Sequence, residues 1–246
     1  MTHLTKSIAL MALAALFTAA GTPAFAQVGG APAAAADRPL FVDVNAGIAS
    51  KPEGLTTGTT FAIFGENGSA ASSLEPGTSA MFDVRLGYRI VSRIGVAAAV
   101  SGGQSDVTGA TAASVPSPIR FASPTVVSLD AGSAKRREIG FHLQLVYVLP
   151  LTDTVMLSVA GGPSIVHLQQ GVPSLNVTSG TPTVTSVNES GNGFGGNVGA
   201  DLSTLFSTHV GVGAFVRYVA ASVDLPSAPG VKAARVQAGG GLRFRF

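Results

Sequence analysis

The chain has 246 residues, a formal net charge of +2 at pH 7 and no cysteine, which excludes disulfides and thiol chemistry. Its longest basic run is Lys135-Arg136-Arg137, which we interpret as a solvated rim at a strand entrance, so no nucleic-acid partner is expected. Hydrophobic residues make up 46% of the chain. After residue 26 they form no run of about 18 apolar residues, which argues against a helical membrane protein.

The first 26 residues have the three parts of a secretory signal peptide. Lys6 supplies the positive start, an apolar run rich in Ala and Leu covers residues 8–20, and Ala24-Phe25-Ala26 is a small-x-small cleavage site. The apolar run is shorter than the ~20 residues of a membrane-spanning helix. The sequence therefore predicts a signal peptide (1–26), a flexible Ala/Gly/Pro lead-in (27–37) and a folded domain (38–246), whose architecture follows from its strand pattern.

Eight segments of the remaining chain alternate apolar and polar residues with the period of two that is typical of a half-buried strand. In the second segment, for example, Val84 and Arg85 face opposite sides. The segments are residues 39–50, 79–90, 94–103, 137–149, 155–166, 193–205, 210–221 and the last strand, which ends at Phe246.

The connections between these segments alternate in length. Residues 91–93, 150–154 and 206–209 are tight turns, whereas the long connections are residues 51–78, 104–136, 167–192 and 222–230. Outer-membrane barrels have short periplasmic turns and long extracellular loops. The pattern therefore predicts an all-β fold: an eight-stranded antiparallel up-and-down transmembrane β-barrel with short periplasmic turns and long extracellular loops.

The long connections are rich in Ser, Thr, Gly and Pro and carry few charges. One interpretation is that strands continue beyond the membrane as hairpins, and we favour it because Thr and Val are ordinary strand formers. The other is an external surface that binds an unknown extracellular ligand.

The last segment places Phe246, Phe244 and Leu242 on one face, and Arg245 and Arg243 on the other. This ending resembles the C-terminal assembly signal of bacterial outer-membrane barrels, a final Phe preceded by apolar residues at every second position. The resemblance implies that barrel-assembly machinery recognises this strand and that the protein lies in the lipid of the bacterial outer membrane.

The whole predicted mature chain resembles the small eight-stranded outer-membrane barrels, the OmpA/OmpX-like group, and we expect a monomer. One departure concerns the aromatic girdles at the membrane borders, which in that group are usually built from Trp and Tyr. This chain has no Trp and only Tyr88, Tyr147 and Tyr218, so Phe would have to take over that position.

Charged residues lie on the face opposite the apolar one. On this parity eight residues point into the lumen: Asp43, Asp83, Arg85, Arg89, Asp201, Arg217, Arg243 and Arg245. An eight-stranded barrel is just wide enough for side chains to fill, so charges inside it must pair. The set is either a solid polar core, which we favour, or a gate whose pairs exchange partners and open a narrow path.

The first and last segments must meet to close such a barrel. If Leu40 lies opposite Phe246 in an antiparallel ladder, Asp43 lies opposite Arg243. We therefore predict that Asp43 is shared between Arg243 and the arginines of the segment 79–90.

The sequence offers no chemistry beyond this charged set. Residues 191–196 match the glycine pattern of dinucleotide sites but open a strand rather than a helix. His142, His167 and His209 lack metal-ligand spacing, and neither His142 nor His167 begins the His-x-Ser pair of barrel-type lipid A deacylases. We predict no catalytic, cofactor or metal site.

The function expected from these observations is a structural or surface-interaction role without enzymatic activity. The alternative is a narrow gated channel for small solutes or ions, and a lipid A-modifying barrel enzyme comes third.

Overall fold

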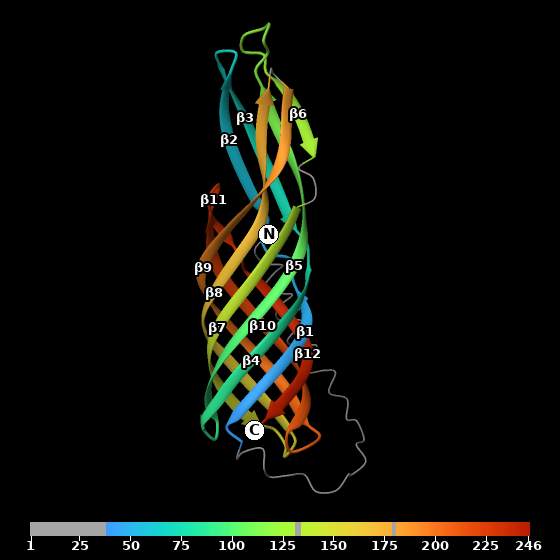
Figure 1. Cartoon of the computed structure of the whole chain (residues 1–246), viewed down its shortest axis with the longest axis vertical. Helices are drawn as coiled ribbons and strands as arrows, with labels where there is room; N and C mark the ends of the chain where they lie inside the picture. The colour runs from blue at the N-terminus through green and yellow to red at the C-terminus, as the bar shows by residue number, and fades with distance from the viewer. Residues whose placement is uncertain (1–37, 131–133, 179–180) are drawn as a thin grey trace.

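The computed structural model describes residues 38–130, 134–178 and 181–246, so the predicted signal peptide and lead-in lie outside the described residues. The described chain forms twelve strands (Figure 1), and no helix in it is long and apolar enough to cross a membrane. The strands are β1 (Leu40–Ala49), β2 (Leu55–Ile63), β3 (Glu66–Pro76), β4 (Ser79–Val91), β5 (Ile94–Val115), β6 (Thr125–Asp130), β7 (Ala134–Pro150), β8 (Val155–Thr178), β9 (Thr181–Leu205), β10 (Val210–Leu225), β11 (Ala228–Lys232) and β12 (Arg235–Arg245).

Strand pairing runs around a ring. Neighbours pair in the order β1–β4–β5–β7–β8–β9–β10–β12, and β12 pairs again with β1. All these pairings are antiparallel, and Figure 1 shows the strands tilted around a common axis. The all-β, antiparallel, up-and-down character predicted from the alternation is therefore observed. The described residues contain twelve strands, however, where the sequence analysis predicted eight.

The additional strands arise from the predicted long connections. β2 pairs with β3, β6 pairs with the far part of β5, and β11 pairs with the end of β10. β5, β8 and β9 also run well beyond their predicted ends. We call this part the crown; it comprises residues 55–76, 108–130, 171–178, 181–189 and 225–232. The favoured interpretation, in which strands continue as hairpins, is confirmed.

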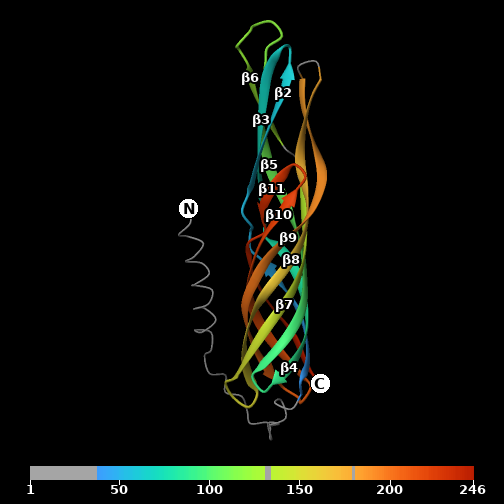
Figure 2. The ribbon, with the colours of Figure 1, turned by 90° about the vertical axis from the view of Figure 1, so that its left-hand side faces the viewer.

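The crown is split into two sheets, which Figure 2 shows on opposite sides. One sheet contains β2, β3, β6 and the far part of β5, and the other contains the β8–β9 hairpin with β10 and β11. Among the described residues, no pairing joins β2 to β11 or β6 to β8. The two sheets therefore leave space between their inner faces.

The opposite end of the ring carries the three predicted tight turns, after β4, β7 and β9. The β9–β10 turn is closed by a backbone hydrogen bond from Phe206 to Val210. The last strand also ends here (Figure 1), where the Phe246 N–H donates to the Leu40 carbonyl at 2.9 Å. The predicted register follows: Asp43 lies opposite Arg243.

Apolar side chains form a belt on the outside of the ring. From Ser79 to Ile90 every second residue of β4 is buried, and the exposed residues between them include Phe82, Val84, Leu86, Tyr88 and Ile90. Val84 is 42% exposed and Arg85 is 8% exposed, so the predicted parity of this strand is correct. A transmembrane strand needs about 9–11 residues, which is the stretch from Phe82 to Ile90. The belt continues on β7 with Phe141, Leu143, Leu145 and Tyr147.

Candidate functional site

Inward-facing charged side chains occupy the half of the ring that is nearer to the tight turns. The structure buries all eight residues predicted to point inward: Asp43, Asp83, Arg85, Arg89, Asp201, Arg217, Arg243 and Arg245. Strand alternation explains this placement, because each residue has the parity opposite to the exposed belt. Desolvated charges are tolerated only when they are paired and hydrogen-bonded, so their contacts decide what this interior can do.

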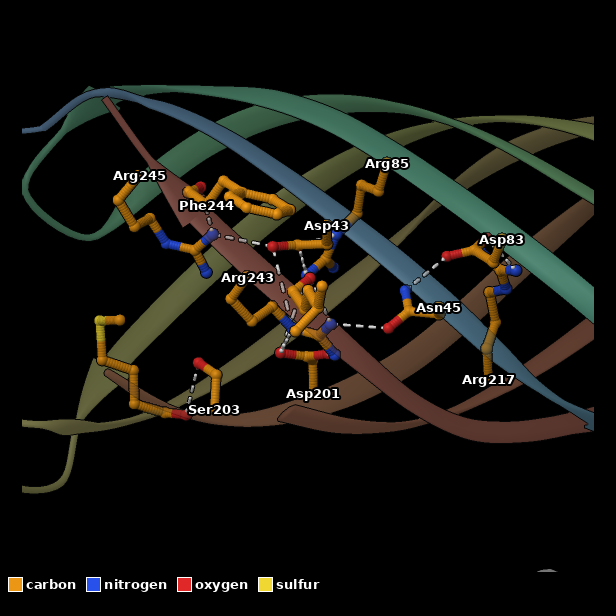
Figure 3. Close-up of polar contacts among 12 residues, drawn as sticks. Asp43, Asn45, Asp83, Arg85, Asp201, Ser203, Arg217, Arg243, Phe244 and Arg245 are labelled. Atoms are coloured by element: carbon orange, nitrogen blue, oxygen red, sulfur yellow. Dashed lines mark hydrogen bonds and ion pairs between the residues drawn. The ribbon is translucent and has the colours of Figure 1, made fainter. Parts of the chain in front are cut away.

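Asp43 on β1 is the centre of the first group of contacts (Figure 3). Arg85 donates to its Oδ2 from Nε at 2.8 Å and from Nη2 at 2.6 Å, and Arg245 donates to its Oδ1 at 2.8 Å. Arg243 Nε lies 3.8 Å from the same Oδ1. Asp43 is therefore shared by three arginines. Its close partner on the last strand is Arg245, not Arg243 as the facing register suggested.

Arg243 instead links Asp43 to a second group. Its Nη2 is 2.5 Å from Asp201 Oδ2, and its Nη1 donates to Asn45 Oδ1 at 2.6 Å. Asn45 in turn donates to Asp83 Oδ1 at 3.0 Å, and Arg217 Nη2 donates to Asp83 Oδ2 at 2.6 Å. These contacts tie β1, β4, β9, β10 and β12 together across the lumen.

Arg89 is the remaining residue of the predicted set. It is 8% exposed, and its Nη2 lies 3.5 Å from Met156 Sδ on β8. The aromatic ring of Phe41 also contacts two of the buried arginines. The guanidinium carbons of Arg85 and Arg245 lie 5.5 and 5.2 Å from the centroid of this ring. Such cation–π contacts add to the stability of buried arginines.

A second charged cluster, which the sequence analysis missed, lies nearer the crown. Glu138 accepts a hydrogen bond from Arg136 Nε at 2.6 Å and forms an ion pair with Arg235 Nη2 at 2.9 Å. Arg136 also donates to Gln170 at 2.9 Å. Arg136 is 1% exposed, so its interpretation as part of a solvated rim was wrong. Extending the alternation of β7 backwards from His142 would have placed Arg136 and Glu138 inside.

His142 is held by two hydroxyls in the ring interior. Its Nε2 lies 2.9 Å from Ser101 Oγ, and its Nδ1 lies 2.8 Å from Ser164 Oγ. All three residues are at most 2% exposed, and they join β5, β7 and β8. Among the described residues no group of His, Asp or Glu has the arrangement of a metal site.

An apolar plug lies where the ring meets the crown, and it includes residues of both. Leu168, Val107 and Val223 have no exposed surface, and Leu55 packs against both of the clusters to which they belong. The plug consists of Leu55, Leu74, Val107, Ala134, Val166, Leu168, Val172, Val219, Ala221, Val223, Leu225, Ala228, Val231 and Ala233. Four ring strands, β5, β7, β8 and β10, contribute to the plug together with β2, β3 and β11, and Leu55 joins its two clusters.

The space inside the molecule is distributed unevenly. Two cavities in the charged interior, both bordered by Arg85, have volumes of about 20 and 10 Å³. A water molecule needs about 10–15 Å³ on this measure, so each cavity has room for about one. A much larger cavity of about 340 Å³, which we call the cup, lies between the two sheets of the crown. Hydroxyl-bearing side chains line much of the cup: Thr57, Thr59, Ser72, Thr111, Ser174 and Ser227.

Comparison with known proteins covers nearly the whole chain. Residues 12–244 match the family model described as the outer membrane protein beta-barrel domain. The fold is similar to that of OprG from Pseudomonas aeruginosa, at 13% identity over 85% of this chain and 96% of that chain, with a TM-score of 0.43.

Two further solved structures are similar to this one. Neisserial surface protein A is 14% identical over 89% of this chain and 100% of that chain, with a TM-score of 0.43. The outer membrane protease OmpT from Escherichia coli is 9% identical over 85% and 97%, with a TM-score of 0.45. No curated protein matches the sequence.

Proposed function

Because this chain belongs to the family of outer membrane protein β-barrel domains, and so to the bacterial outer membrane, we propose that it is a non-conducting, non-enzymatic barrel that presents its crown outside the cell. In this proposal the eight ring strands cross the lipid. The tight turns then lie on the periplasmic side, and the crown carries the surface-interaction role. The observation that supports the proposal most is the filled interior.

Two layers oppose the passage of solutes. In the lower layer the ion pairs around Asp43 and Asp83 occupy the lumen and leave space only for single waters. In the upper layer the plug presents apolar side chains, which cannot replace the water shell of an ion. A path through the ring would have to break both layers at once.

The crown has the properties of a binding region. The volume of the cup falls within the range of about 300–1,000 Å³ that is typical of small-ligand sites. Its hydroxyl groups supply donors and acceptors, and Glu189 adds one carboxylate, which already accepts a hydrogen bond from Ser227 at 2.8 Å. Both crown sheets contribute to the lining, so a ligand in the cup would contact both.

The arrangement around His142 supports a non-enzymatic role. A serine hydroxyl within hydrogen-bond distance of a histidine is the geometry of an activated nucleophile. Here Ser101 and His142 are 1% and 2% exposed, and neither borders the two interior cavities or the cup. A substrate would have no route to this pair.

Conductance in planar lipid bilayers tests the proposal. Heat-modifiable mobility first verifies how much of the reconstituted protein is folded. This folded protein should give no unitary current steps above the leak of the lipid, because both layers block the lumen. Stepwise currents at that density would contradict the proposal.

A narrow gated channel is the second candidate, and the composition of the interior favours it in one respect. Among the described residues, the buried charged side chains are seven arginines against four acids: Arg85, Arg89, Arg136, Arg217, Arg235, Arg243 and Arg245 against Asp43, Asp83, Glu138 and Asp201. An excess of positive charge attracts anions. Currents from an opened barrel should therefore be anion-selective, which a reversal potential in a salt gradient measures.

Phe246 offers a test of assembly. Its side chain is 55% exposed, so it contributes little to internal packing, and we propose that the assembly machinery reads it. Phe246→Ser should reduce the amount of folded protein in the outer membrane while export continues, as measured by cell fractionation and heat-modifiable mobility. The matched control is Leu40→Ser, since Leu40 is the exposed residue hydrogen-bonded to Phe246 through the backbone. Normal outer-membrane levels of Phe246→Ser would contradict the assignment.

A further inference from the structure

Arg137 on β7 is a cation at the upper edge of the apolar belt. It is exposed, and its side chain makes no ion pair or hydrogen bond among the described residues. The next residues on the same face of β7 are Ile139, which is half-buried, and Phe141, which belongs to the belt. Arg137 therefore lies where the hydrocarbon of a membrane gives way to its headgroups.

Two amide side chains flank Arg137 on this face. Register places Gln104 of β5 on one side and Gln169 of β8 on the other, and both are exposed. A guanidinium between two amides offers several N–H donors to one anion, and this donor set suits phosphate oxygens. Lys135, two residues earlier on the same face, lies opposite Asp106, so its charge is partly offset by that carboxylate.

A hollow of about 330 Å³ lies beside Arg137, in the wall formed by β4, β5 and β7. Gln104 and Arg137 border it, and its apolar surface includes Phe82 and Ile139. Gly102 makes this shape possible, because a Cβ there would lie 2.5 Å from the Phe82 ring. The hollow also reaches Glu138, but that carboxylate is already paired with Arg136 and Arg235.

We propose that this hollow binds one phosphorylated lipid of the outer leaflet. The phosphate contacts Arg137 and Gln104, and an acyl chain lies along Phe82 and Ile139. A lipid fits better than a free phosphate because the hollow continues into the lipid-facing belt, so one molecule satisfies both the cation and the apolar surface. The inference rests on the proposed orientation, with the crown outside and Arg137 at the outer border.

Lipid retention in native mass spectrometry tests this site. The full chain is extracted from vesicles that contain equal amounts of lipid A bisphosphate and zwitterionic phosphatidylcholine. The wild-type protein should retain one lipid A molecule, and Arg137→Gln should retain about tenfold less, as expected when a charge-assisted hydrogen bond is lost. The matched control is Arg93→Gln, which removes an exposed cation from the β4–β5 turn at the opposite border.

Three outcomes would overturn the site: equal retention by Arg137→Gln and the wild type, equal loss in Arg93→Gln, or displacement of the lipid by millimolar inorganic phosphate. The last would identify a free-anion site. Folding of each variant is checked by heat-modifiable mobility, and Gly102→Ala, which disturbs the apolar surface rather than the cation, should also lower retention. Lipid retention does not depend on conductance. Failure of the retention test would therefore leave the proposal of a non-conducting barrel intact, and a barrel found to conduct could still bind the lipid.

Discussion

Replacing Asp43 with alanine should lower the free energy of unfolding by ~3–5 kcal/mol, the usual cost of removing one partner from a buried ion pair. The carboxylate accepts hydrogen bonds from Arg85 and Arg245 and has Arg243 at 3.8 Å. Without it, Arg245 loses this partner, while Asp201 remains as an acidic partner of Arg85 and Arg243. Urea unfolding in lipid vesicles measures the loss.

A double-mutant cycle identifies the partner. Adding Arg245→Ala to Asp43→Ala should restore part of the lost stability, and more than adding Arg243→Ala, because Arg243 keeps its contact with Asp201. Asp153→Ala, in the exposed β7–β8 turn, is the control and should change stability by less than about 0.5 kcal/mol. Strictly additive losses for Asp43 with both arginines would show that neither of them is coupled to Asp43.

Val84→Arg should destabilise the protein in lipid by ~2–4 kcal/mol, the cost of an arginine that faces the middle of a bilayer. Val84 is 42% exposed, and its partners on the neighbouring strands are Val44 and Val100, which are exposed as well. In water such a position would accept arginine at little cost, so the penalty reports contact with lipid. The same urea unfolding assay measures it.

Two further substitutions turn this into a depth series. Ile90→Arg, at the border of the belt next to the β4–β5 turn, should cost much less, because the penalty falls towards zero at the interface. Thr60→Arg, exposed on β2 in the crown, should cost nothing measurable. Equal stabilities for Val84→Arg and Thr60→Arg would mean that β4 does not face lipid.

Much of the ring could be predicted because its signals are local. A period of two assigns each residue to a face, which is why Val84 and Arg85 were placed correctly. Tight turns fix the pairing of neighbouring strands. Placing Leu40 opposite Phe246 then brought Asp43 opposite Arg243, as observed.

The partners across the lumen could not be predicted in the same way. Arg217 reaches Asp83 from the other side of the ring, 134 residues away in the chain, and such contacts depend on strand tilt and stagger, which alternation does not encode. The register of the strands also does not identify the partner of an arginine, because its long side chain reaches beyond the residue directly opposite on the neighbouring strand. Arg243 therefore contacts Asp201 closely, and Arg245 takes Asp43.

The ends of the strands were missed for a different reason. Beyond the belt the strands are rich in Ser, Thr, Gly and Ala, so apolar and polar residues do not alternate clearly in the sequence and the segments read as loop, although burial still alternates along β3. The crown strands were accordingly assigned to connections, and Arg136 and Glu138, at the start of β7, were left outside the interior.

The measurement that tests the filled, lipid-facing barrel most directly is a spin-label scan along β5 in lipid vesicles, from residue 94 to residue 103. The chain has no cysteine, so each label is unique, and the inward positions Ala97 and Ala99 belong to no ion pair. Labels at Val96, Ala98 and Val100 should collide with oxygen dissolved in lipid, and labels at Ala97 and Ala99 should be shielded from both oxygen and a water-soluble nickel complex. Access of the nickel complex to those inward positions, or collisions without alternation, would contradict the account.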